Sequence, residues 1–333
     1  MKIVNSLKNY FKYKNLPEVF IDDLKSMPIS KIFSTYGFIL IKNFFSRSTI
    51  EKTLNEINKV LEIGDLSLTE KYMSDAVNRD TYFLNLILSE NLTFLNSTLL
   101  GKDYFFLQTY DIHANTYAHQ WHRDISSKTG GYIDFCNNSA HIIKYAAYFE
   151  SSNSGFFVIP GSHRSNLMNS VFGKDMYDIT KKINFIKSCR NNEVLCIIPE
   201  PGDLIVFDLR ILHCAANLDD VQKPSKNSKQ FRKKVLWPSF GRKSFFGESI
   251  YQYYRFLRKD FGQVRFGKHA ENKLKKRGLL PQNYEKISTE HLTWLKDNIM
   301  YPEVFNPMLF LDDMHKTVRK FRLNFFNNNK IGK

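Results

Sequence analysis

The feature that most constrains the fold is a series of short apolar segments in the middle of the chain, roughly residues 104–240. The segments read DYFFLQTYDIHA, HIIKYAAYFE, GFFVIP, EVLCIIP, DLIVFD and KKVLWPSF, and Gly, Pro, Asn and Ser residues separate them. Short runs rich in β-branched and aromatic residues, bounded by turn residues, are typical of β-strands. Many such strands at close spacing predict a sandwich or a barrel.

The sequence on either side of this region predicts helices. YGFILIKNF (36–44) indicates a strand, and SRSTIEKTLNEINKVLEIG (46–64) a helix that begins with a capping box of Ser48 and Glu51. Three further helical segments follow the strands: SIYQYYRFLRKDF, STEHLTWLKDNIM and DDMHKTVRKFRLNFF. We therefore expect one domain over 1–333, with a β core and N-terminal helices in 30–245 and a helical C-terminal extension in 246–333.

Length and composition fit a folded protein with one large core. The chain has 333 residues, 43% of them hydrophobic, with 29 Phe and 17 Tyr. No apolar run approaches the ~20 residues of a membrane span, and MKIVNSLKNYFKYKN lacks the apolar segment of a signal peptide, so we expect a cytoplasmic location. The four cysteines form no C-x-x-C pair, and we expect them to be reduced: Cys136, Cys189, Cys196 and Cys214.

Positive charge is concentrated in one segment. The net charge is +15, and the segment 222–281 alone contains 17 Lys or Arg and three acidic residues, a net +14. Such a surface attracts anions, which include phosphorylated or nucleotide-linked small molecules, nucleic acid and acidic membranes. The alternative is a solvated surface in a chain that is rich in lysine throughout.

The stretch QWHRD (120–124) offers two candidate metal ligands. In a strand, residues at i and i+2 point to the same side, so His122 and Asp124 are placed to share one ion. The alternative is a polar strand edge or turn, because H-x-D strings also arise by chance.

A third candidate ligand follows the apolar strand in PGDLIVFDLRILHCAAN (201–217). His213 lies 91 residues after His122. Two histidines and one carboxylate form the facial triad that binds ferrous iron and leaves positions open for other ligands. The same three ligands could also hold zinc or manganese.

These motifs, with GFFVIPGSHRSN (155–166) between them, form an ordered set. H-x-D, then G-x-x-x-x-P-G-S-H, then G-D-L-x-x-F-D followed by His and Asn, resembles the phytanoyl-CoA dioxygenase family of Fe(II)/2-oxoglutarate-dependent oxygenases, over roughly residues 30–245. The resemblance implies a mainly β fold, a double-stranded β-helix (jelly-roll, cupin-like) with flanking helices. It also implies Fe(II) held by His122, Asp124 and His213, with 2-oxoglutarate as cosubstrate and O2 as oxidant.

The resemblance further implies two cosubstrate-binding residues. Arg232 matches the family's arginine for the distal carboxylate of 2-oxoglutarate, and Tyr145 falls where the family places an aromatic wall, although core packing is an equal alternative for Tyr145. His163 is expected to hydrogen-bond nearby backbone rather than to bind metal. One departure from the family pattern is Ala215, where relatives often carry a serine.

The resulting prediction is a dioxygenase that hydroxylates an unactivated C–H bond of a small, anionic organic substrate and releases succinate and CO2. A halogenase would lack the carboxylate that Asp124 supplies, and a catalytically dead member would usually lack a ligand. The main rival is a nucleic-acid-acting enzyme or binding protein that uses the basic segment 222–281. Four aromatic residues interleave with its charges: Tyr251, Tyr253, Tyr254 and Phe256.

Overall fold

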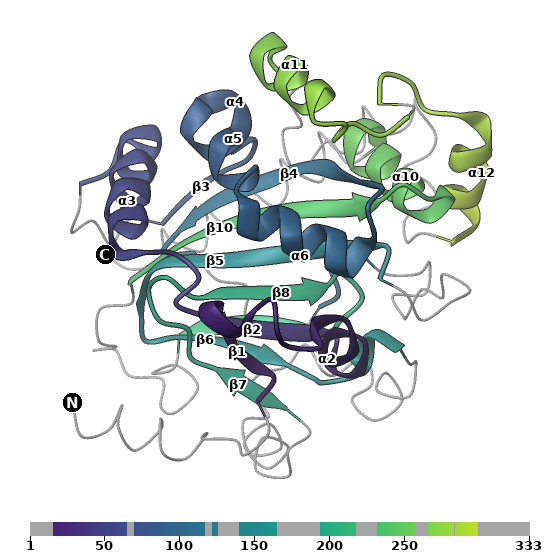
Figure 1. The fold of residues 1–333 in the computed structure, drawn as a ribbon. Helices are drawn as coiled ribbons and strands as arrows, with labels where there is room; N and C mark the ends of the chain where they lie inside the picture. The colour runs from purple at the N-terminus through teal and green to yellow at the C-terminus, as the bar shows by residue number, and fades with distance from the viewer. Residues whose placement is uncertain are drawn as a thin grey trace, which may run out of the picture.

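The computed structural model shows two β-sheets with helices packed around them (Figure 1). It describes residues 16–64, 70–116, 122–125, 140–164, 194–217, 232–257, 266–282 and 284–298. No helix in these ranges is long and apolar enough to cross a membrane.

The larger sheet has seven strands in the order β1-β2-β8-β5-β10-β4-β3. Its strands are β1 (Glu18–Phe20), β2 (Phe38–Lys42), β3 (Lys71–Met73), β4 (Tyr104–Ala114), β5 (Ile142–Ser152), β8 (Leu204–Asp208) and β10 (Arg232–Arg242). β1 and β2 are parallel, and all other neighbours are antiparallel. The three longest strands, β5, β10 and β4, are neighbours in this sheet.

The smaller sheet has three antiparallel strands in the order β7-β6-β9. They are β6 (Ser154–Val158), β7 (Leu195–Ile197) and β9 (His213–Asn217). All six apolar segments that were predicted as strands are strands here: β4, β5, β6, β7, β8 and β10. The prediction of a sheet-rich fold with flanking helices is confirmed.

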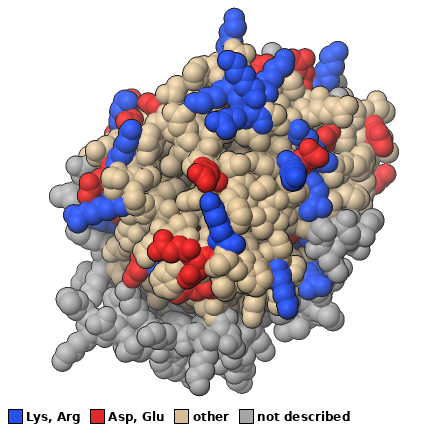
Figure 2. Space-filling view, in the orientation of Figure 1, with Lys and Arg blue, Asp and Glu red and all other residues tan. Residues whose placement is uncertain are grey.

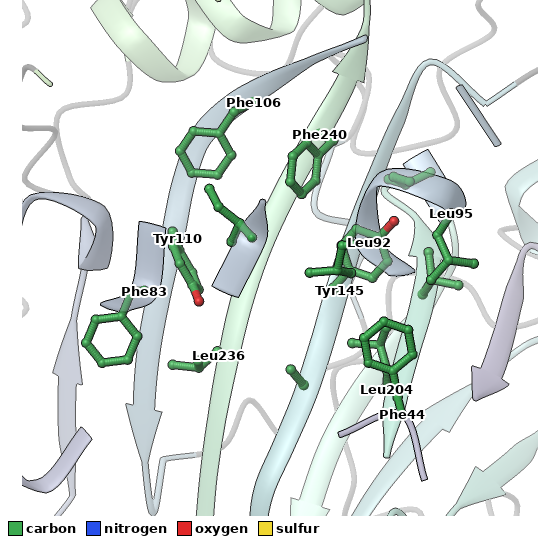
Figure 3. Close-up of a cluster of buried hydrophobic side chains, with 14 of the residues drawn as sticks. Phe44, Phe83, Leu92, Leu95, Phe106, Tyr110, Tyr145, Leu204, Leu236 and Phe240 are labelled. Atoms are coloured by element: carbon green, nitrogen blue, oxygen red, sulfur yellow. The ribbon is translucent and has the colours of Figure 1, made fainter. Parts of the chain in front are cut away.

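Helices cover one face of the larger sheet, which we call the outer face. In Figure 1 these helices lie in front of and above the sheet. They are α2 (Ile29–Tyr36), α3 (Arg47–Leu61), α4 (Ala76–Arg79), α5 (Thr81–Ile87), α6 (Glu90–Leu100) and α11 (Lys268–Lys276), and a short 3-10 helix, Ile21–Asp23, follows β1. Figure 3 shows part of the apolar cluster between the helices and the sheet, with Leu92 of α6 beside Tyr145.

The opposite face, which we call the interior face, is covered in two parts. The smaller sheet covers one part, and Phe156 packs there with Phe38 and Val235. The second part is covered by α10 (Phe245–Gln252), the π-helical turn Tyr253–Leu257 and α12 (Thr289–Asn298). Tyr251 and Leu295 from these helices pack against Phe105 of β4.

One helix begins earlier than the sequence predicts. Ser46, not Ser48, is the N-cap of α3, because Ser46 has extended backbone and its hydroxyl accepts a hydrogen bond from the Thr49 N–H. Ser48 lies inside the first turn. The predicted helix over 312–326 lies outside the described residues.

Candidate metal centre

The three predicted ligands come together at the interior face. The backbone N–H groups of His122 and His213 each donate to the other residue's carbonyl at 3.0 Å, which forms an isolated antiparallel bridge. The two imidazole rings are 4.3 Å apart between centroids. One potential ligand atom from each of His122, Asp124 and His213 lies within 4.8 Å of the others. Among the described residues, this is the one group of three His, Cys, Asp or Glu side chains close enough to hold an ion.

The protonation states of the site favour metal binding. Burial lowers the pKa of His213 to about 3, so its imidazole is neutral at neutral pH. Its Nδ1 lies 3.1 Å from the Ile211 carbonyl, which can only accept, so Nδ1 carries the proton and Nε2 keeps its lone pair. Burial opposes the ionisation of Asp124, but Lys144 and the two histidines hold its pKa below the usual range. The site therefore offers two nitrogen ligands and a carboxylate.

The backbone of the segment 122–125, which we call the ligand segment, is anchored on one side by the PGSH turn. Arg123 is buried, and its guanidinium donates to the Ser162 carbonyl at 2.7 Å and to the Arg210 carbonyl. The Ser162 hydroxyl in turn accepts from the Leu212 N–H, next to the ligand His213. The PGSH turn thus connects the two halves of the metal centre without supplying a ligand.

The C-terminal helices anchor the ligand segment on its other side. The Tyr254 hydroxyl donates to the backbone carbonyl of Asp124 at 3.1 Å. Ile125 packs in the same apolar cluster as Tyr254, and its N–H donates to the Leu209 carbonyl at 3.4 Å. This contact was not predicted, because nothing in the sequence near Tyr254 indicates which backbone group its hydroxyl meets.

His163 has the structural role that the sequence predicts. Its Nε2 lies 3.2 Å from the carbonyl of Ser34, on α2. The ring packs against Gly37, where φ is +80° and an added Cβ would lie 2.3 Å from Nδ1. His163 therefore fixes the PGSH turn against α2, and it does not join the metal ligands.

Two lysines point toward the interior, and the sequence analysis identified neither. The Lys144 ammonium lies 3.1 Å from Asp124 Oδ2 and 5.3 Å from the centre of the Trp237 ring. Lys233 shares its side of β10 with Val235 and Trp237, and it is 1% exposed. Burial lowers the pKa of Lys233 to about 7.

Arg232 lies on the other side of β10 from Lys233, which argues against the role predicted for it. As the i, i+2 rule predicts, it shares a face with Lys234, but that face is the outer one. Both cations contact Glu150, Arg232 at 3.9 Å and Lys234 at 2.9 Å. The side chains of Val235 and Trp237 fix this orientation, because both are packed between the two sheets.

Tyr145 also lies on the outer face. Its hydroxyl donates to Asn96 Oδ1 on α6 at 2.8 Å, and its ring packs edge-on against Phe240. Figure 3 shows it within the cluster beneath the helices. Its neighbour Lys144 reaches Asp124 on the opposite face, so Tyr145 has the core-packing role that was the alternative to a pocket wall.

Two buried donors on the interior face lack a hydrogen-bond partner within the described part of the chain. They are the Tyr148 hydroxyl and the Trp237 indole N–H. Both side chains belong to the cluster between the sheets. Buried donors usually have a partner, so this pair is suited to an anionic or carbonyl-bearing ligand.

The basic segment divides between different surfaces. Figure 2 shows Lys and Arg gathered in the region of α11, which carries Lys268, Lys273, Lys275 and Lys276. α11 packs on the outer-face cluster through Ala270 and Leu274, on the other side of the large sheet from the metal centre. Tyr251, Tyr253 and Tyr254 are buried, so they offer no surface for stacking bases.

Comparisons with known proteins give only weak similarities. No protein-family model matches the sequence, and no curated protein matches it. HygX from Streptomyces hygroscopicus with nickel and 2-oxoglutarate bound is similar in structure, with 11% identity, 64% of this chain and 85% of that chain covered, and a TM-score of 0.49. SnoK, a non-heme alpha ketoglutarate dependent carbocyclase from nogalamycin biosynthesis, has 13% identity and a TM-score of 0.47, with 66% of this chain and 86% of that chain covered. EctD from S. alaskensis with bound Fe has 12% identity and a TM-score of 0.46, with 71% of this chain and 80% of that chain covered. At these values the likeness carries no argument, and the proposals below depend on side-chain geometry.

Proposed function

We propose that this chain is an Fe(II)- and 2-oxoglutarate-dependent dioxygenase with a double-stranded β-helix core. The observation that carries the proposal is the convergence of His122, Asp124 and His213 between two facing sheets. Two histidines and a carboxylate with other positions left open are typical of non-heme iron oxygenases. The order of the motifs around them, which resembles the phytanoyl-CoA dioxygenase family, supports the same reading.

The residues present fit an iron ion. The nitrogen of His213 is neutral and Asp124 is ionised, as metal ligands must be. Hydrogen bonds to backbone hold the ligand segment on both sides, from Arg123 and from Tyr254. Such supporting contacts orient ligands before the metal arrives.

The interior also fits a dicarboxylate cosubstrate. We assign Lys233, in place of Arg232, to the distal carboxylate, because Lys233 is the basic residue of this strand that faces the interior. The Tyr148 hydroxyl and the Trp237 N–H are further donors on that face. When bound, iron and 2-oxoglutarate would together activate O2 for hydroxylation of an unactivated C–H bond, with release of succinate and CO2. The chain's part is to hold these groups in place and to exclude water from the space between the sheets.

The proposed substrate is a small, anionic organic molecule. The basic residues Lys223, Lys226 and Lys229, which precede β10, lie outside the described residues, and they remain candidates for contacting its charged group. Burial of Tyr251, Tyr253 and Tyr254 leaves Phe256 as the one partly exposed member of the four aromatic residues, which weakens the sequence argument for nucleic acid.

Binding of metal and cosubstrate tests the proposal. Anaerobic titration of the protein with Fe(II) and 2-oxoglutarate should produce the visible charge-transfer band of the chelate, and His213→Ala should abolish it. His269→Ala, which removes an exposed histidine on α11, is the matched control and should leave the band unchanged. A band of normal strength in His213→Ala would rule out this metal centre. Succinate release screened against a mixed metabolite library would then identify the substrate.

A further inference from the structure

Lys144 has a position that the proposed function does not yet use. It lies on β5, in the middle of the larger sheet, and reaches the metal centre from the interior face. Its ammonium contacts a carboxylate oxygen of Asp124 and the face of Trp237, and its side chain is 18% exposed. Both contacts restrict the movement of the ammonium group.

The two oxygens of Asp124 have different neighbours. Oδ1 lies 3.7 Å from His122 Nε2, on the side of the other ligands. Oδ2 lies 3.1 Å from the Lys144 ammonium. An oxygen that already accepts a charged hydrogen bond is a poorer metal ligand, so Asp124 is prepared to give the metal one oxygen and not two.

We propose that Lys144 is a positioning residue that restricts Asp124 to one metal bond and makes metal binding depend on an anionic co-ligand. This inference rests on the proposed function, because it concerns the same metal centre. The restriction keeps one more coordination position open for the cosubstrate. The positive charge of Lys144 is a second, separate contribution.

The charge argument compares the site with and without the lysine. A divalent ion and the Asp124 carboxylate together carry one positive charge, and Lys144 raises this to two. The added charge repels a bare metal ion and attracts a dianion such as 2-oxoglutarate. Lys144 should therefore weaken binding of the metal alone and strengthen binding of metal and dianion together.

The test is a comparison of Co(II) affinity with and without 2-oxoglutarate, because Co(II) does not oxidise readily and its visible spectrum reports its coordination. In the wild type, saturating 2-oxoglutarate should tighten Co(II) binding. In Lys144→Met this tightening should shrink at least tenfold, while Lys144→Arg, which keeps the charge, should retain most of it. Lys234→Met removes a lysine on the outer face of the same sheet and should match the wild type.

Each outcome separates the two proposals. Absence of Co(II) and Fe(II) binding in the wild type would overturn the proposed function, and this inference with it. Normal binding in the wild type, with tightening in Lys144→Met within twofold of the wild-type value, would overturn the role of Lys144 alone. Equal weakening of Co(II) binding with and without 2-oxoglutarate would assign Lys144 a purely structural role, also against the proposal. Lys144→Gln, with the same two affinity measurements, replaces Lys144→Met if the latter does not fold.

Discussion

Replacement of Lys233 by methionine should stabilise the metal-free protein while weakening cosubstrate binding. The lysine is buried, and burial lowers its pKa from 10.5 to about 7. A difference of about 3.5 pKa units corresponds to a cost of roughly 5 kcal/mol at about 1.4 kcal/mol per unit, which is an upper bound. This cost to folding is full below pH 7 and disappears above pH 10.5, because between these values the unfolded chain binds more protons than the folded one.

The pH dependence of stability is the diagnostic measurement. Urea unfolding of wild type and Lys233→Met, with chelator present, should show the variant more stable at pH 7. The difference should then shrink by about 1.4 kcal/mol for each pH unit up to pH 9.5. A change in packing alone would separate the two stability curves by the same free energy at every pH. A separation that shrinks as the pH rises therefore isolates the effect of the charge. Parallel curves for the two proteins would refute the assignment of a buried, cationic Lys233.

The same variant should bind 2-oxoglutarate less tightly. Loss of a charged hydrogen bond costs about 1.5 to 3 kcal/mol, or roughly ten- to a hundredfold in affinity. Arg232→Leu, on the outer face, should change the affinity little. Opposite effects on stability and binding are expected of a residue kept for function at a cost to the fold.

Two further predictions concern the contacts around the site. Tyr254→Phe removes the hydrogen bond to the Asp124 carbonyl and should weaken Co(II) binding about tenfold, with little change in far-UV circular dichroism. Unchanged Co(II) affinity would show that the C-terminal helices do not hold the ligand segment. Tyr145→Phe removes the hydroxyl that donates to the buried Asn96 oxygen and should lower the free energy of unfolding, measured in urea, by about 1 to 3 kcal/mol. A large loss of 2-oxoglutarate affinity at normal stability would instead show that Tyr145 lines the cosubstrate pocket.

The sequence predicted the strands and the ligands better than it predicted the faces of the strands. The apolar segments are local signals, and strands formed where they indicate. At His122 and Asp124 the sequence predicted a strand, and the structure has an isolated bridge at His122 followed by a bend. The pairing of His122 with His213 is not local, and it was inferred from the ligand types of a facial triad and from the resemblance to a family. Local signals do not encode contacts between distant segments, which depend on how the sheets close.

The orientation of β5 and β10 could not be read from the sequence, because both strands are buried on both sides. A strand covered by helices on one face and by a second sheet on the other has no alternation of polar and apolar residues. Among Arg232, Lys233 and Lys234, nothing local marks which one points inward, and a shift of one residue reverses the answer. The same ambiguity affects β5, where Tyr145 was considered for the cosubstrate pocket although its neighbour Lys144 is the residue that faces the interior.

Charge in the interior bears on where an anionic substrate would bind. Asp111 pairs with Trp237 across the sheet and so shares the interior face, which brings two carboxylates, Asp111 and Asp124, together with Lys144 and Lys233. Burial keeps His113, on the same face, neutral. With both lysines protonated, these side chains balance, so the two charges of a ferrous ion would be matched by the two of 2-oxoglutarate. We infer that, apart from Arg123, whose guanidinium donates to two backbone carbonyls, the described interior has no surplus cation for a third anionic group. The reacting part of the substrate should therefore be uncharged, and its anionic part should stay at the surface, where salt would weaken its binding.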